Sequence, residues 1–171
     1  LLCLLLSHAD MEKELIDAAD KLLKSCRNRG WTVATAESCT GGMVAAALTA
    51  IAGSSDVMDR GFVTYTNDAK HEMIGVPMPL FETVGAVSEE VAKAMAEGAR
   101  RTASVDLACG ITGVAGPGGG SKEKPVGLVH IAAASANATI HERCQFEGDR
   151  HAVRLASAFK ALEMMTNLAE Q

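Results

Sequence analysis

Apolar residues recur every three or four positions between Met11 and Arg29, with charged residues between them. This spacing is typical of an amphipathic helix, and Gly30 suits the position just beyond its C-terminus. Ser88 and Asp149 are preferred N-cap residues, and each precedes another helical pattern. The pattern therefore predicts three long helices, over residues 11–29, 89–102 and 150–169.

Short apolar runs rich in β-branched residues alternate with these helices and predict strands. The predicted strands cover 32–36, 61–66, 105–111, 126–134 and 139–146. Two shorter helices are predicted over 41–52 and, with Asn67 as N-cap, up to Ile74. The segment 75–85 contains two prolines and is predicted to be a loop.

Strands that alternate with helices predict an α/β fold, and two adjacent strands joined around residues 135–137 predict a hairpin. We expect three α/β/α layers around a mainly parallel mixed sheet that contains one antiparallel hairpin. The 171 residues suit one domain. We place it at 11–171, and residues 1–10 are predicted to be an N-terminal extension whose apolar run is too short to cross a bilayer.

Composition narrows the possible partners. A net charge of −5 without a basic run argues against nucleic acid as a partner, and aromatic residues are only 4% of the chain, so the core must be aliphatic. The sequence contains no stretch of ~20 apolar residues, so no membrane span is predicted. Five scattered cysteines without CxxC spacing predict reduced thiols and a cytoplasmic protein.

The histidines lack the spacing of metal ligands, although His130 and His141 are predicted to be neighbours across the hairpin. We therefore expect no metal and no cofactor. The small, alanine-rich helices suggest close packing and self-association, so the protein is expected to be a homo-oligomer.

Polar motifs follow three predicted central strands. Ser38-Cys39-Thr40 follows the first, the motif 65–70 ends the second, and the glycine-rich segment 112–120 follows the third. Ligands bind beyond the carboxyl ends of the strands in open parallel sheets. The hairpin should return the chain to the same edge at Arg150, so connectivity alone predicts a functional cleft there.

Ser38 is a candidate nucleophile, and Lys70 in the first turn of a helix is its candidate base. The positive end of the helix dipole and partial burial would both lower the pKa of Lys70. Tyr65 would orient this lysine or relay a proton. In the alternative interpretation, Ser38 only caps a helix, Lys70 is a solvated surface residue and Tyr65 has a structural role. Cys39, beside Ser38 at the start of the helix, is a competing nucleophile.

The segment 112–120 offers backbone N–H groups that suit an oxyanion or a phosphate, although it matches neither a Walker A nor a dinucleotide-binding motif. Arg150 would hold an anionic group of a substrate. The alternatives are a flexible surface loop and a surface ion pair between Arg150 and a neighbouring carboxylate. Gly41 and Gly42 would let a ligand approach the backbone closely.

Four segments together closely resemble the C-terminal domain of the CinA (competence/damage-inducible) family. They are TAESCTGG at 35–42, YTNDAK at 65–70, GITGVAGPGG at 110–119 and PVGLV at 125–129. The resemblance covers residues 11–171, and Thr66 is a mild departure from a serine that is frequent in the family.

The resemblance implies an amidohydrolase that converts nicotinamide mononucleotide and water to nicotinate mononucleotide and ammonia in pyridine nucleotide salvage. It implies Ser38 as nucleophile, Lys70 as base and Tyr65 as the third member of the site. Residues of these motifs, together with Arg150, are expected to bind the nucleotide substrate: Thr40, Gly41, Gly42, Asn67, Thr112, Gly113, Gly116 and Arg150.

Two alternatives use the same cleft. A nucleotide-binding regulatory module would bind the ligand without turnover, because glycine loops and hydroxyls at helix starts serve recognition as well as chemistry. A phosphotransferase would need Mg²⁺, and the sequence has no convincing carboxylate pair to hold it.

Overall fold

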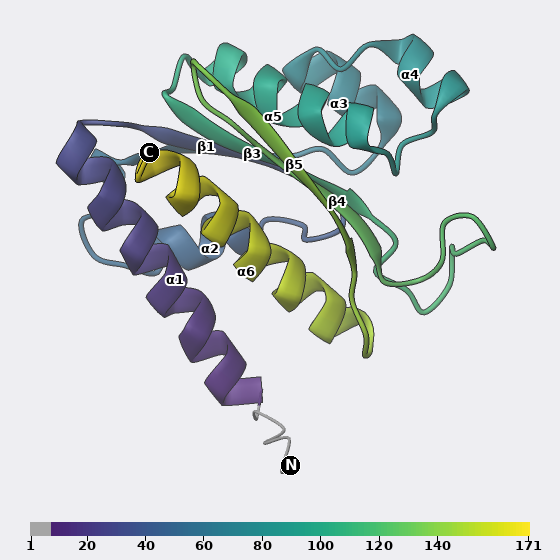
Figure 1. The fold of residues 1–171 in the computed structure, drawn as a ribbon, viewed down its shortest axis with the longest axis horizontal. Coiled ribbons are helices and arrows are strands. Elements are labelled where there is room, and N and C mark those ends of the chain that lie inside the picture. The colour runs from purple at the N-terminus through teal and green to yellow at the C-terminus, as the bar shows by residue number, and fades with distance from the viewer. Residues whose placement is uncertain (1–7) are drawn as a thin grey trace.

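Five strands form one sheet with helices on both faces, which confirms the predicted fold class (Figure 1). The computed structural model describes the backbone of residues 8–171 and the side chains of residues 12–171. The strands are β1 (Val33–Glu37), β2 (Met58–Val63), β3 (Leu107–Gly113), β4 (Leu128–Ala134) and β5 (Thr139–Gln145). The helices are α1 (His8–Arg29), α2 (Met43–Thr49), α3 (Asn67–Ile74), α4 (Met78–Thr83), α5 (Glu89–Ala103) and α6 (Arg150–Ala169), with the short 3₁₀ helix η1 (Ser54–Asp56).

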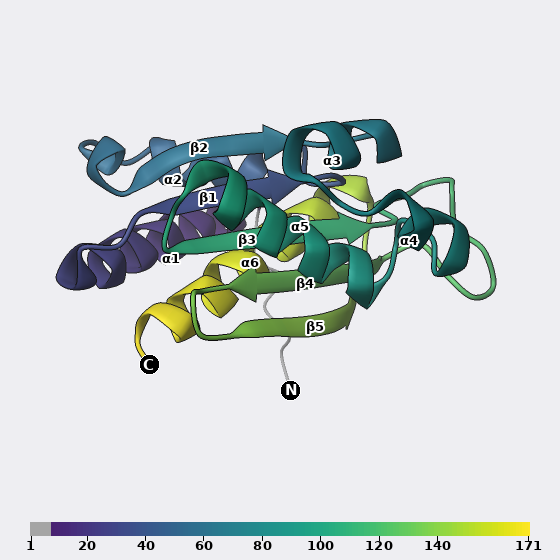
Figure 2. The same ribbon diagram turned by 90° about the horizontal axis from the view of Figure 1, so that it is seen from above.

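The order of the strands across the sheet is β2-β1-β3-β4-β5 (Figure 2). Strand β1 runs parallel to both of its neighbours, β2 and β3. Strands β3, β4 and β5 pair antiparallel, so the predicted hairpin is confirmed. The carboxyl ends of β1, β2 and β3 therefore meet at one edge of the sheet, and β5 returns the chain to that edge at the start of α6.

Helices α1, α2 and α6 cover one face of the sheet, and α3, α4 and α5 cover the other (Figure 1). Each face buries its own core of aliphatic and methionine side chains, as the low aromatic content requires. The first core includes Leu22, Leu107, Ile131 and Leu162. The second includes Ile74, Val91, Met95 and Ala108.

The long helices were predictable from capping and periodicity. The side chain of Ser88 caps α5 by accepting from Val91 N–H, and that of Asp149 caps α6 by accepting from Ala152 N–H. Helix α1 begins at His8, ahead of the predicted start, and the rest of the predicted extension lies outside the described residues. In the part of the chain that the structure describes, no helix combines the length and apolarity needed to cross a membrane.

The prediction was wrong around β2 and α3. Strand β2 starts and ends three residues before the predicted 61–66, because β-branched and aromatic residues continue past its last ladder pair. The N-cap of α3 is Thr66 and not Asn67: the Thr66 hydroxyl accepts from Ala69 N–H at 3.1 Å. Lys70 therefore lies one position further into the helix than its spacing from Asn67 predicted.

The predicted loop 75–85 contains helix α4. Pro77 is its N-cap and Pro79 lies in its first turn. The N–H groups of the first helical turn have no partner within the helix, so proline, which has no N–H, is tolerated there. These two prolines therefore begin a helix in the segment that was predicted to be a loop. The predicted helix 41–52 is shortened at both ends to α2.

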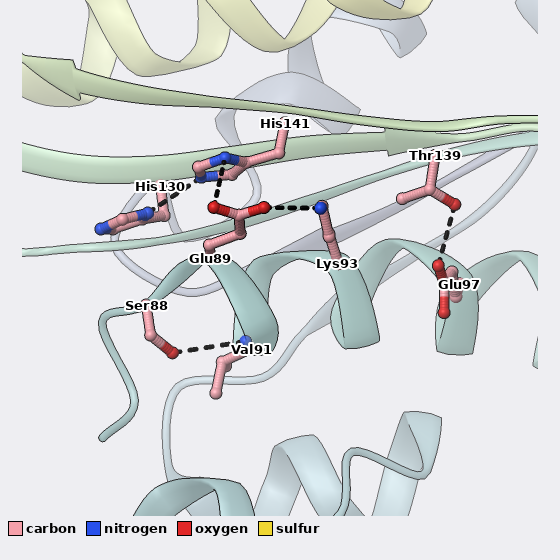
Figure 3. A network of polar contacts seen from close by, with 8 residues as sticks. All are labelled: Ser88, Glu89, Val91, Lys93, Glu97, His130, Thr139 and His141. Carbon is pink, nitrogen blue, oxygen red and sulfur yellow. Dashed lines mark hydrogen bonds and ion pairs between the residues drawn. The ribbon is translucent and has the colours of Figure 1, made fainter. Parts of the chain in front are cut away.

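A polar network ties α5 to the hairpin (Figure 3). Nδ1 of His130 on β4 lies 2.9 Å from Nε2 of His141 on β5, which confirms that the two histidines are neighbours. Nδ1 of His141 lies 3.4 Å from the Glu89 carboxylate, which also pairs with Lys93. The network thus joins the first turn of α5 to both strands of the hairpin.

Candidate active site

Ser38 and Lys70 meet at the carboxyl edge of the sheet. Ser38 follows β1 and is half-buried, and its N–H donates to Ile111 O of β3 at 3.1 Å. Lys70 comes from the start of α3, and its Nζ lies 3.2 Å from Oγ of Ser38, within hydrogen-bonding distance. The structure therefore brings together the serine and the lysine that the sequence selected.

The amine of Lys70 is enclosed by protein. The residue is only 2% exposed, and its Nζ has a second neighbour in the carbonyl oxygen of Tyr65, at 3.5 Å. Burial lowers the pKa of Lys70, with a smaller opposing contribution from Cys39. Desolvation thus favours the neutral amine that the sequence interpretation required.

Glu37 holds the turn that carries Ser38. This last residue of β1 is fully buried, and its carboxylate accepts three backbone N–H bonds. The donors are Gly42 at 3.0 Å, Val44 at 3.1 Å and Ala45 at 2.9 Å. A carboxylate at the start of α2 accepts from N–H groups that lack partners within the helix. Its negative charge also interacts favourably with the positive end of the helix dipole. Sequence reasoning missed this role, although an acidic residue between a strand and a helix was visible.

Gly41 and Gly42 are required by the backbone of this turn. Their φ angles are +60° and +98°, a region that favours glycine. Their N–H groups bond within the protein, Gly41 to Ser38 O and Gly42 to Glu37. The backbone conformation of the turn thus gives a structural reason for both glycines, beside the predicted role in ligand approach. Cys39 and Thr40 carry the remaining N–H groups of the turn.

Cys39 is a poor competitor for the role of nucleophile. Its side chain is buried, and burial raises the pKa of the thiol to about 11. The position near a helix start, which the sequence suggested would favour a thiolate, is outweighed by desolvation.

Tyr65 and Arg150 contact each other across the edge of the sheet. Nη2 of Arg150 donates to the Tyr65 hydroxyl at 3.0 Å, and Nη1 donates to Gly116 O at 2.7 Å. Tyr65 is 60% exposed, and only its backbone carbonyl faces Lys70. The phenol therefore positions Arg150, where the sequence had suggested that it positions Lys70.

A cleft of about 620 Å³ lies beside these residues. Arg154, one turn after Arg150 on α6, donates to the carbonyls of Cys39 and Thr40 at 3.1 and 2.8 Å. Sequence reasoning missed Arg154, although its spacing of four from Arg150 placed both on one helix face. The cleft is lined by, among others, Ala115, Pro117, Val126, Gly148, Arg150 and Arg154.

The other predicted binding residues differ in accessibility. The Thr112 hydroxyl donates to Ala86 O at 2.7 Å, and the Thr40 side chain is fully buried. A Cβ on Gly113 would lie 2.7 Å from a methyl of Val129, so this glycine permits the packing of β3 on β4. Asn67 is exposed at the start of α3.

This arrangement defines an α/β protein with a serine–lysine pair at the carboxyl edge of its sheet and an arginine-lined cleft beside it. Residues 15–169 match the model of the CinA C-terminal domain. The chain belongs to this family.

Curated relatives of two sizes match the chain. A CinA-like protein of Geobacter sp. (strain M21) is 53% identical over 146 residues, which are 85% of this chain and 35% of that protein. The chain thus spans about a third of the length of the CinA-like relatives. A protein of Enterobacter agglomerans named nicotinamide-nucleotide amidohydrolase PncC is 48% identical, over 89% of this chain and 93% of its own length.

Solved structures share the fold. The competence/damage-inducible protein CihA of Agrobacterium tumefaciens superposes with a TM-score of 0.89 at 48% identity, covering 92% of this chain and 96% of that one. A CinA superfamily protein of Klebsiella pneumoniae superposes with a TM-score of 0.87 at 33% identity, covering 91% of this chain and 98% of that one.

Proposed function

We propose that this chain is an amidohydrolase that deamidates nicotinamide mononucleotide to nicotinate mononucleotide and ammonia. The observation that carries the proposal is the buried amine of Lys70, 3.2 Å from the hydroxyl of Ser38. A neutral amine beside a serine is a known means of activating a nucleophile. The full-length similarity to the Enterobacter agglomerans amidohydrolase supports the substrate class.

The first half of the reaction releases ammonia. Ser38 Oγ attacks the carboxamide carbon while Lys70 Nζ takes the hydroxyl proton. The amides of Cys39 and Thr40 are the candidate donors to the oxyanion. The C–N bond then breaks, and Lys70 returns its proton to the leaving nitrogen, which departs as ammonia and leaves an ester on Ser38.

The second half restores the serine. Lys70 takes a proton from water, and the resulting hydroxide attacks the ester carbon. The bond between that carbon and Ser38 Oγ breaks, and Oγ regains its proton from Lys70. The first product is the carboxylic acid of nicotinate mononucleotide. At neutral pH it ionises to the carboxylate, and the proton it loses converts the ammonia to ammonium, so atoms and charge balance without a redox partner.

The arginine-lined cleft suits the anionic end of a nucleotide, and Arg154 connects it to the turn that carries Ser38 through the carbonyls of Cys39 and Thr40. Arg150 and Arg154 both line it, and guanidinium groups match phosphate geometry well. In this proposal Tyr65 and the carbonyl of Gly116 hold Arg150 in place. The carboxamide then lies at Ser38 and the phosphate in the cleft.

We also infer a cytoplasmic enzyme of pyridine nucleotide salvage that self-associates. The described cysteines Cys26, Cys39, Cys109 and Cys144 are free thiols, as expected in a reducing compartment. Val63 at the end of the edge strand β2 is 49% exposed, which favours contact with a second copy. Light scattering of the purified protein tests the self-association.

Substitution of the two central residues tests the mechanism. We expect Ser38→Ala and Lys70→Ala each to lower ammonia release from nicotinamide mononucleotide by at least about 10³-fold, because nucleophile and base act as one unit. Cys39→Ala is the matched control, and it should retain most of the activity. Parental turnover in either of the first two variants, or its loss only in the control, would refute the assignment.

A further inference from the structure

Thr64 has a buried hydroxyl without a partner next to the serine–lysine pair. The residue is fully buried, and no described group forms a hydrogen bond with its Oγ1. An unpaired buried hydroxyl has a cost in stability, because it has lost its hydrogen bonds to water without gaining one in the protein. A feature with that cost at a reaction centre calls for an explanation in the reaction.

The backbone places Thr64 beside Ser38. In the parallel ladder Ala36 pairs with Phe62 and Glu37 with Val63, so the next positions in register are Ser38 and Thr64. The N–H of Thr64 donates to Glu37 O at 2.9 Å, which continues this pairing. Because side chains alternate along a strand, Thr64 points to the same face as Phe62, the face covered by α3 and α5.

Lys70 reaches the same point from α3. Its Nζ lies between Ser38 Oγ at 3.2 Å and the carbonyl of Tyr65 at 3.5 Å. Tyr65 directly follows Thr64, and Ser38 is the position in register with Thr64 on the neighbouring strand. Thr64 is therefore next to both residues that contact the amine, to Tyr65 along the chain and to Ser38 across the ladder.

We propose that Thr64 is a positioning residue whose hydroxyl accepts the third N–H of Lys70 once the amine has taken the proton of Ser38. An ammonium has three donors, and Ser38 and Tyr65 provide acceptors for two of them. The unpaired Thr64 hydroxyl is the acceptor that this account assigns to the third N–H. The hydroxyl stands unpaired in the resting protein because its partner proton arrives only during the reaction.

The expected effect of Thr64 on turnover rests on the proposed function, whereas its expected effect on the pKa of Lys70 does not. A hydrogen bond to the ammonium stabilises the charged form, so its loss should lower the pKa of Lys70 further. Thr64→Val removes the hydroxyl and keeps the shape. Thr64→Ser keeps the hydroxyl.

Thr35→Val is the matched control. Thr35 Oγ1 is also buried without a partner, but Thr35 lies on β1 and its Oγ1 faces Gly61 on the side of the sheet that α2 covers. The control therefore removes an equivalent hydroxyl from the opposite face. We expect it to change neither the titration of Lys70 nor turnover.

The experiment titrates the Lys70 amine by NMR, assigned with Lys70→Arg, and measures ammonia release from nicotinamide mononucleotide in each variant. In Thr64→Val we expect the pKa of Lys70 to fall by about one unit and kcat to fall roughly tenfold, with KM little changed. The acidic limb of its kcat/KM profile should move to lower pH. Thr64→Ser should restore both values.

Thr64→Val should also be at least as stable to urea as the parental protein, because it removes an unpaired polar group. An unchanged Lys70 titration, or a marked loss of stability, would overturn the role of Thr64. If the parental protein itself released no ammonia, the proposed function would fail, while the NMR titration would still decide whether Thr64 and Lys70 are coupled.

Discussion

Glu37 connects the stability of the protein to the position of Ser38. Its carboxylate accepts three N–H bonds from the turn and from the first turn of α2. Glu37→Gln replaces one acceptor oxygen with an NH₂ group that faces these donors. We expect the free energy of unfolding to fall by about 1–3 kcal/mol, measured by urea denaturation.

Turnover of Glu37→Gln should fall as well, because the turn that carries the serine loses its anchor. Glu72→Gln is the control, since Glu72 is exposed on α3 and should change stability by less than about 0.5 kcal/mol. Equal stability of the two variants would contradict the anchoring role of Glu37.

At this scale the sequence identified the serine and lysine that the structure brings together, but not the residues that surround them. Ser38 and Lys70 carry side chains whose chemistry can be read from the residue type. The side chains of Glu37 and Arg154 bind backbone groups, and Thr64 is placed by its pairing with β1. These arrangements are determined only when strands pair and helices pack. The hydroxyl of Tyr65 was assigned to the wrong neighbour for the same reason.

The contact between α5 and the hairpin gives the stability of the protein a pH dependence. Burial, with smaller contributions from His141 and Arg143, lowers the pKa of His130 to about 4, from 6.5. Burial also lowers the pKa of His141, against the opposing charge of Glu89. The unfolded chain therefore binds protons that the folded protein does not bind, and stability is lost as pH falls from about 6.5 towards 4.

Urea denaturation at a series of pH values between 7 and 4.5 measures this effect. We expect the free energy of unfolding to fall more steeply with decreasing pH in the parental protein than in His130→Phe, which has lost one titrating group. The two curves differ only through the histidine network of Figure 3. Parallel curves for the two proteins would show that the network does not contribute.

Helices with strong capping signals were predicted well, whereas the bounds of the edge strand β2 were not. Capping by Ser88 and Asp149 marked the starts of α5 and α6 correctly. The bounds of β2 depend on its register with β1, which includes an irregularity after Val33. No local pattern in the sequence encodes that register, so the predicted strand was displaced.

The whole molecule determines the site, because its parts come from segments far apart in the sequence. Three strands end at one edge, and the antiparallel hairpin returns α6 to that same edge. This convergence was predictable from connectivity and the rules for parallel sheets. A cleft at this edge was predicted as well, but its walls were not, because they come from loop conformations around Gly116 and Gly148.

Stoichiometric product analysis with the purified parental chain tests the account most directly. With nicotinamide mononucleotide as substrate, we predict sustained release of ammonia with an equal amount of nicotinate mononucleotide. Binding that raises the melting temperature without releasing ammonia would contradict the account and identify a nucleotide-binding module instead.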